Sequence, residues 1–157
     1  MDDPEATSYF PPGRIVSTST PGADPSGDYA WDLFRKAEAL RPGAFQTLDA
    51  KALKLTGGPN SPPPPKDRSL YGAIVEKAEA DIFLTYCTSA VLARKEVPSL
   101  KIVAIPDTLA VGAEYGIAVV QSARPEAVRF AAYVRSPMGR AILVRHGFGL
   151  PPAPPRP

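Results

Sequence analysis

Hydroxyl side chains gather at a predicted junction between a strand and a helix near the start of the chain. Residues 14–18 form a β-branched run typical of a strand, and a turn-rich segment at 19–27 follows it before an amphipathic helix. Free backbone N–H groups and the helix dipole make such a helix start a site for anions. Ser26 and Gly27 are the expected donors, Ser26 through its hydroxyl and both through their amides. The alternative is that these residues only cap the helix and shape the turn.

A second set of hydroxyls follows the apolar run at residues 81–86, which has the composition of a strand. Ligands of open α/β sheets bind outside the carboxyl ends of the strands, and Tyr86 falls at such an end. We therefore expect Tyr86 to donate its phenolic O–H to a ligand, with Thr88 and Ser89 beside it. The alternative is a tyrosine packed at the margin of the core, with its hydroxyl bonded to backbone.

A third junction places Arg68 and Ser69 at the start of another predicted helix. Ser69 can cap that helix, and Arg68 supplies a cation that could pair with an anion. The alternative for Arg68 is a solvated surface side chain. Spacing alone leaves both interpretations open.

Residues suited to covalent or metal chemistry are scarce. The chain has one cysteine, Cys87, and one histidine, His146, which excludes an internal disulfide and any site built on several histidines. A thiolate–imidazole pair would need the fold to bring the two together, so Cys87 is better interpreted as a small buried apolar residue. No Walker loop, dinucleotide-binding glycine motif or nucleophile elbow occurs. We expect no enzyme activity, no cofactor and no protein-bound metal.

Alternating strands and helices must position these junctions. Residues 48–55 fit either a strand or a helical turn, and residues 110–120 form a further apolar segment. This alternation predicts an α/β fold with a mainly parallel or mixed sheet. The predicted strands lie at 14–18, 81–86 and 100–105, and the predicted helices begin near Pro25, Leu70, Ala90, Pro125 and Pro137.

Composition narrows the class of protein. The 157 residues carry 18 Lys and Arg against 16 Asp and Glu, a net charge of +2 that is too small and scattered for a dedicated nucleic-acid binder. No apolar stretch approaches the roughly 20 residues that cross a bilayer, so we expect no membrane insertion. Of the 20 prolines, 13 cluster at the start, in a loop at 57–66 and in the tail. Between Gly13 and Leu150 the composition is that of an ordinary globular protein.

Five blocks of sequence, taken in order from about Gly13 to Leu150, resemble molybdate-binding proteins, the substrate-binding components of ABC importers. The order of the blocks is more specific than any one of them. They read I-V-S-T-S-T-P-G-A-D-P-S-G-D-Y-A-W-D-L-F, A-L-K-L-T-G-G-P, A-D-I-F-L-T-Y-C-T-S-A, L-A-V-G-A-E-Y-G-I-A-V-V and S-P-M-G-R-A-I-L-V-R-H-G-F.

The resemblance implies a two-lobed clamp of the type II periplasmic-binding-protein fold that closes on a tetrahedral oxyanion, molybdate or tungstate. It matches Ser26 to a helix start that offers a backbone amide, and Tyr86 to the family's ligand-binding tyrosine. Arg68 or Ser69 would fill the remaining amide position. Oriented N–H and O–H dipoles can hold a dianion without a formal countercharge. Arg68 departs from the apolar residue usual in the family, which leaves the exact anion open.

The resemblance also implies how the chain divides. Members of the family have a substantial N-terminal segment with much of the first lobe and an export signal, whereas this chain starts inside the second lobe. By that comparison the parts are a flexible lead-in at 1–12, a second-lobe α/β domain at 13–108, the returning segment and C-terminal helices of the first lobe at 109–150, and a proline-rich tail at 151–157.

By the same resemblance, the protein is expected in the periplasm, with an ABC permease as its partner. The acidic start shows no secretory signal, so the chain expressed as written is expected in the cytoplasm. Two alternatives remain: a remnant of such a protein that binds nothing, and an effector-sensing domain of the same fold. The second predicts a DNA-binding helix-turn-helix nearby, and the sequence contains no such segment.

Overall fold

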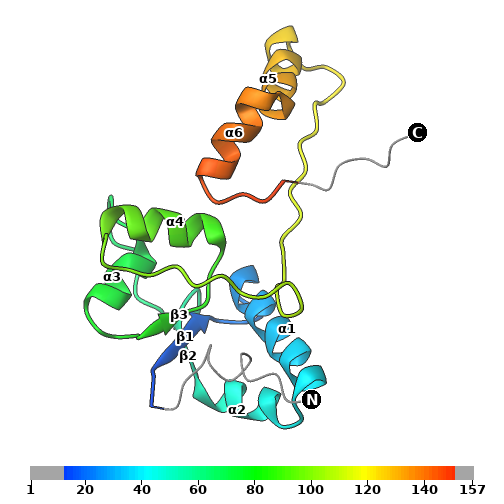
Figure 1. The fold of residues 1–157 in the computed structure, drawn as a ribbon. Helices are drawn as coiled ribbons and strands as arrows, with labels where there is room; N and C mark the ends of the chain where they lie inside the picture. The colour runs from blue at the N-terminus through cyan, green and yellow to red at the C-terminus, as the bar shows by residue number, and fades with distance from the viewer. Residues whose placement is uncertain (1–12, 151–157) are drawn as a thin grey trace. The chain divides into compact units, whose positions relative to one another are not determined.

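A three-stranded parallel sheet lies at the centre of the first part of the chain in a computed structural model, which describes residues 13–150. β1 (Val16–Ser19) lies between β2 (Ala52–Thr56) and β3 (Ile82–Phe83), so the strand order is β2-β1-β3 (Figure 1). The segments predicted as lead-in and tail, 1–12 and 151–157, lie outside the described residues.

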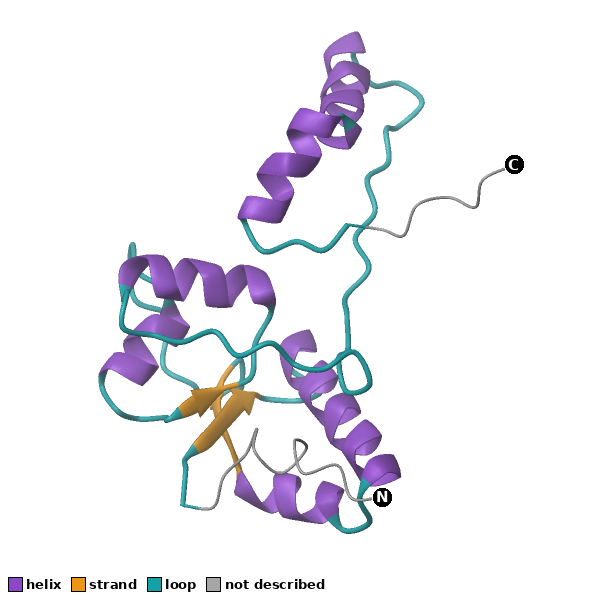
Figure 2. Ribbon diagram, in the orientation of Figure 1, coloured by secondary structure: helices purple, strands orange, loops and turns teal. Residues whose placement is uncertain are grey.

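Helices make the connections that parallel strands require (Figure 2). The helices α1 (Pro25–Leu40) and α2 (Ala44–Lys51) join β1 to β2, and α3 (Leu70–Glu76) joins β2 to β3. α4 (Cys87–Glu96) follows β3. The sheet lies between the α1–α2 pair and the α3–α4 pair (Figure 1). The prediction of an α/β fold with a parallel sheet is thus confirmed, while the finer assignment to type II stays a prediction.

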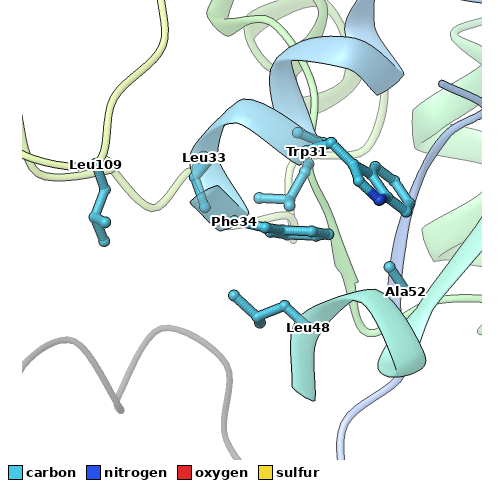
Figure 3. Close-up of a cluster of buried hydrophobic side chains, with 8 residues drawn as sticks. Trp31, Leu33, Phe34, Leu48, Ala52 and Leu109 are labelled. Carbon is cyan, nitrogen blue, oxygen red and sulfur yellow. The ribbon is translucent and has the colours of Figure 1, made fainter. Parts of the chain in front are cut away.

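The buried apolar core fills the space between the sheet and the α1–α2 pair (Figure 3). Phe34 of α1 is fully buried there, and its ring lies 5.1 Å from that of Trp31. Trp31 keeps its polar atom satisfied, because its Nε1–H donates to Asp49 at 2.9 Å. The buried members of the cluster are Ala30, Trp31, Leu33, Phe34, Leu48, Ala52, Leu84 and Leu109.

Two predicted strands differ from what the structure contains. Residues 100–105 are extended but form no strand, and only Ile82–Phe83 of the run at 81–86 belong to the sheet. Composition identified runs able to form strands, but a strand also needs a neighbour to accept its backbone hydrogen bonds. Residues 48–55 contain both structures left open, since α2 ends at Lys51 and β2 follows directly.

The chain divides into two compact units, one up to Gly112 and one from Ala113. The second unit contains α5 (Pro125–Arg135) and α6 (Pro137–Arg145). Ser136 separates the two helices and caps α6, because its Oγ accepts the Gly139 N–H at 3.2 Å. Within this unit the ring of Tyr115 lies edge-on to that of Phe148 at 5.5 Å. The assignment of 13–108 and 109–150 to two lobes stays a prediction.

Candidate functional site

The carboxyl ends of the three parallel strands meet at one edge of the sheet, and hydroxyl side chains tie two of them together there. The hydroxyl groups of Ser19 at the end of β1 and Thr56 at the end of β2 lie 2.8 Å apart in a buried hydrogen bond. Thr20 adds two bonds to the Thr56 carbonyl, one from its backbone N–H at 2.8 Å and one from its hydroxyl at 2.9 Å. The first turn after β1 is therefore fixed against the end of β2.

The start of α1 is capped by a carboxylate. Asp24 Oδ1 accepts the Ser26 backbone N–H at 2.9 Å, and the Asp24 carbonyl accepts the Gly27 N–H at 2.9 Å. Ser26 itself is only 5% exposed. Both amides predicted as anion donors thus already have partners within the chain. An anion that used the Ser26 amide would have to displace a negative charge.

Two glycines at this edge stand where no side chain would fit. A Cβ at Gly27 would lie 2.6 Å from backbone atoms of the turn after β1, the Ser19 carbonyl oxygen among them. Gly57, with a positive φ of 73°, passes so close to Asp24 that a Cβ would lie 2.6 Å from its Oδ2. The loops after β1 and β2 therefore enclose Asp24 tightly, and Gly27 serves close packing as well as any role as a donor.

Tyr86 lies at the same edge as Ser26. It is the N-cap residue of α4, and its ring packs edge-on against Tyr29 of α1 with 5.9 Å between the ring centroids. Tyr29 is one helical turn beyond Ser26. The structure thus places Tyr86 against α1, at a residue one helical turn from Ser26, although Ser26 and Tyr86 are 60 positions apart in the sequence.

Ser69 and Arg68 are held by other partners, away from Tyr86. The Ser69 N–H donates to the Glu96 carboxylate at 2.7 Å, and the Ser69 hydroxyl caps α3 by accepting the Gly72 N–H. Glu96 ends α4, whereas Tyr86 precedes its first residue, so ten residues of helix, about 15 Å, separate the two. The structure therefore does not bring Ser69 close to the edge that carries Ser26 and Tyr86.

Arg68 pairs with a carboxylate of its own segment. Its Nη2 lies 2.7 Å from Glu76 Oε2, and the hydrogen bond and charge of Glu76 raise the pKa of the guanidinium above its usual value. Both side chains are half-exposed, so solvent weakens the pair. The charge of Arg68 is thus largely matched within the chain.

Three buried hydroxyl oxygens have no hydrogen-bond partner among the described residues. They belong to Ser17 and Thr18, which are fully buried in β1, and to Thr85, which directly precedes Tyr86. Burying a hydroxyl without a hydrogen bond costs about 1–3 kcal/mol. Ser17 and Thr18 are consecutive in a strand and therefore belong to opposite faces of the sheet. Of the three residues, only Thr85 lies in the loop after β3, next to Tyr86.

Cys87 and His146, which were considered for a thiolate–imidazole pair, belong to different units. Cys87 begins α4 in the first unit and is exposed, so the prediction of a buried cysteine is wrong: a side chain in the first turn of a helix at the sheet edge has little to pack against. His146 follows α6 in the second unit. Among residues 13–150, no group of three His, Cys, Asp or Glu side chains could hold a metal ion.

Sequence reasoning missed two residues that shape this region, Thr56 and Glu96. Thr56 makes three hydrogen bonds with Ser19 at the end of β1 and with Thr20 after it, but only the parallel pairing of β1 and β2 brings it there. Glu96 accepts a hydrogen bond from the Ser69 N–H, although the two residues are 27 positions apart in the sequence. Neither has a local signal in the sequence. Asp24, by contrast, has a local signal, because it stands directly before Pro25, a residue typical of the first turn of a helix.

Comparison with known proteins shows the family. Residues 9–149, nearly the whole chain, match a protein family described as "bacterial extracellular solute-binding protein". The chain belongs to this family of solute-binding proteins. Its name gives the family a role in binding a solute outside the cytoplasm and agrees with the prediction of a substrate-binding component. It does not name molybdate or any other solute.

One relative is PM1146, an uncharacterized protein of Pasteurella multocida. It is 32% identical over 117 residues, which cover 74% of this chain and 48% of the relative. The chain therefore spans about half the length of the curated relative it matches. No solved structure is significantly similar to it. Within residues 13–150, every helix is too short or too polar to cross a membrane.

Proposed function

We propose that this chain supplies part of a binding site for a small tetrahedral oxyanion, of the molybdate or tungstate kind, in a periplasmic protein that serves an ABC permease. Membership of the solute-binding family supports the general role, and the sequence resemblance supports the oxyanion. The observation that carries the proposal is the position of Tyr86 beside the first turns of α1, at the carboxyl edge of a parallel sheet.

The donors at this edge suit an anion without a cationic partner. Tyr86 offers a phenolic O–H, Ser26 a hydroxyl, and Thr85 a buried hydroxyl that has no partner among the described residues. Neutral donors of this kind stabilise a dianion through oriented dipoles. Because the chain spans only about half of its relative, we propose that further donors come from the part of the protein outside it.

Calorimetric titration of the whole chain with molybdate, tungstate and sulfate tests the proposal. We expect binding of molybdate or tungstate that Tyr86→Phe weakens roughly 10- to 100-fold, because a hydrogen bond to a charged group contributes about 1.5–3 kcal/mol. Tyr71→Phe is the matched control: Tyr71 also packs on an aromatic ring, that of Phe83 at 4.8 Å, but from α3. Binding that is absent, or that both variants weaken equally, would overturn the proposal.

Asp24 provides a second, independent test. Asparagine caps helices as well as aspartate, so Asp24→Asn keeps the start of α1 while it removes the charge beside the Ser26 amide. Two like unit charges 4 Å apart repel by about 1 kcal/mol even in water. We therefore expect Asp24→Asn to bind molybdate about fivefold more tightly. Unchanged affinity would show that the anion lies elsewhere.

The second candidate is a remnant that binds no solute. The observation that favours it is the occupation of the Ser26 and Ser69 amides by the carboxylates of Asp24 and Glu96. A partial site also lacks the opposing donors and the closure that excludes water. This candidate predicts a broad, non-cooperative urea transition and no heat of binding with any of the three anions.

A further inference from the structure

Four consecutive prolines at residues 62–65 lie in the loop between β2 and α3, which the proposed solute site does not use. Proline fixes φ at about −65°, and a residue that precedes proline is confined to extended backbone. The described residues contain no cis peptide bond, and residues 62–65 form neither a turn nor an α-helix. Successive trans prolines form a polyproline II helix, which has about three residues per turn. The run is therefore a short polyproline II helix.

Most of this short helix faces solvent. Pro62, Pro63 and Pro64 are exposed, and Pro65 is half-buried. Because each turn contains about three residues, the three exposed rings point to different sides of the helix, and Pro65 shares a side with Pro62. The side of the helix that carries Pro65 thus faces the protein, while the rings of Pro63 and Pro64 offer an apolar surface to a partner.

Hydrogen bonds fix the chain both before and after the run. Before it, the Gly58 N–H donates to Ser61 Oγ and the Ser61 N–H donates to the Gly58 carbonyl, each at 3.0 Å. After it, Ser69 is buried and its N–H donates to the Glu96 carboxylate at 2.7 Å. A stiff segment held at both ends loses little conformational entropy when it binds. The loop therefore presents its prolines in a conformation already suited to recognition.

One cation stands at the end of the run. Lys66 follows the last proline, is exposed, and forms no ion pair with another residue of the described range 13–150. Asp67 then takes a positive φ of 56°, so the backbone turns directly after Lys66. Arg68, by contrast, already pairs with Glu76. A single unpaired lysine is too little charge to hold a nucleic acid or an anionic membrane, but it suits one carboxylate.

We propose that residues 62–66 are a docking ligand for a partner protein whose binding groove is lined by aromatic rings and carries a carboxylate at one end. The rings of the groove pack against the exposed prolines, and the carboxylate pairs with Lys66. The backbone carbonyls of the run accept no hydrogen bond inside a polyproline II helix, so they are free to accept from tyrosine or tryptophan side chains of the groove. This partner is distinct from the solute, and the inference does not depend on which anion binds.

A nuclear magnetic resonance titration tests the proposal, with an isotope-labelled WW domain that recognises proline runs beside a cation as the probe. The whole chain should shift the signals of the aromatic groove in a saturable way. Pro63→Ala combined with Pro64→Ala should weaken binding about tenfold, because truncation removes the apolar contact. Pro98→Ala is the matched control, since Pro98 is an exposed proline in the turn after α4, and it should bind like the parent chain. Lys66→Ala should weaken binding at low salt but not at high salt.

Three results would overturn the proposal. If neither the chain nor a peptide of residues 58–69 binds the probe, the run only stiffens its loop. If the peptide binds but the chain does not, the fold hides the run. If the double alanine variant binds like the parent chain, the second proline-rich sequence, at 151–157, is the ligand instead. The urea midpoint of each variant, expected to match that of the parent, separates lost binding from lost folding.

Discussion

Carboxylates accept backbone N–H groups at several places in the first unit. Asp24 accepts the Ser26 N–H, Glu96 accepts the Ser69 N–H, and Glu38 accepts those of Gly43 and Phe45 at 3.0 and 2.8 Å. Each of these contacts is stronger when the carboxylate is ionised. At the scale of single residues, much of the local structure therefore depends on groups that acid would protonate.

Glu38 gives the clearest pH dependence. The N–H groups of Gly43 and then of Phe45 lower its pKa below the usual 4.5. A carboxyl with a lowered folded pKa stabilises the fold above its unfolded pKa, and that contribution disappears as the pH falls through the folded value. We expect Glu38→Gln to lower the urea midpoint at pH 7 and to change it little at pH 3.

The control for Glu38 is Glu79→Gln, because Glu79 is exposed and its side chain makes no hydrogen bond to another described residue. Its urea midpoint should follow the parent chain at both pH values. A Glu38→Gln effect equal at pH 7 and pH 3 would contradict the assigned role of the Glu38 carboxylate.

Among the predicted site residues, local signals sufficed for the helix caps and failed for distant partners. The sequence D-P-S-G predicts a capped helix start, and Asp24 does cap α1. The sequence also indicated Ser69 as a cap, and Ser69 caps α3. Nothing near Ser69 indicates Glu96, because their contact depends on how α3 packs against α4. Whether Ser26, Gly27, Arg68, Ser69 and Tyr86 bind a solute stays a prediction.

At the scale of elements, the approach of α1 to the turn after β1 fixes the candidate site. The contact is between backbones, so it depends on the missing side chain at Gly27. We expect Gly27→Ala to destabilise the first unit by about 1–3 kcal/mol, as overpacking does when rigid neighbours cannot yield. Urea unfolding followed by Trp31 fluorescence measures it.

Gly112→Ala is the control for this substitution, because nothing lies within 4 Å of a Cβ there. Its free energy of unfolding should stay within about 0.5 kcal/mol of the parent chain. Equal effects of the two substitutions would contradict the packing argument at Gly27.

Periodicity identified helices better than strands. Leu33 and Phe34 are buried in α1, as its apolar spacing predicts, whereas Leu40 on the same predicted face is 55% exposed. A helix completes its hydrogen bonds within its own segment, so local sequence contains most of the information. The run at 100–105 has the composition of a strand but no strand beside it, which local sequence cannot reveal.

At the scale of the whole molecule, apolar burial is uneven. The first unit has a core around Phe34, whereas the helices of the second unit bury only Gly139. We expect Phe34→Ala to lower the stability of the first unit by about 3–5 kcal/mol. Hydrogen exchange in α5 and α6 should not change, because those helices belong to the other compact unit. Faster exchange in those helices would mean that the two units unfold together.

The central strand β1 also limits the stability of the fold. All four residues of β1, V-S-T-S, are buried, and two of the three hydroxyls lack a partner among residues 13–150. Apolar side chains of similar size, such as valine for Thr18, would remove that penalty and should raise the melting temperature. The central strand thus contains polar side chains that lower the stability of the fold, as in proteins where polar groups serve a role other than folding.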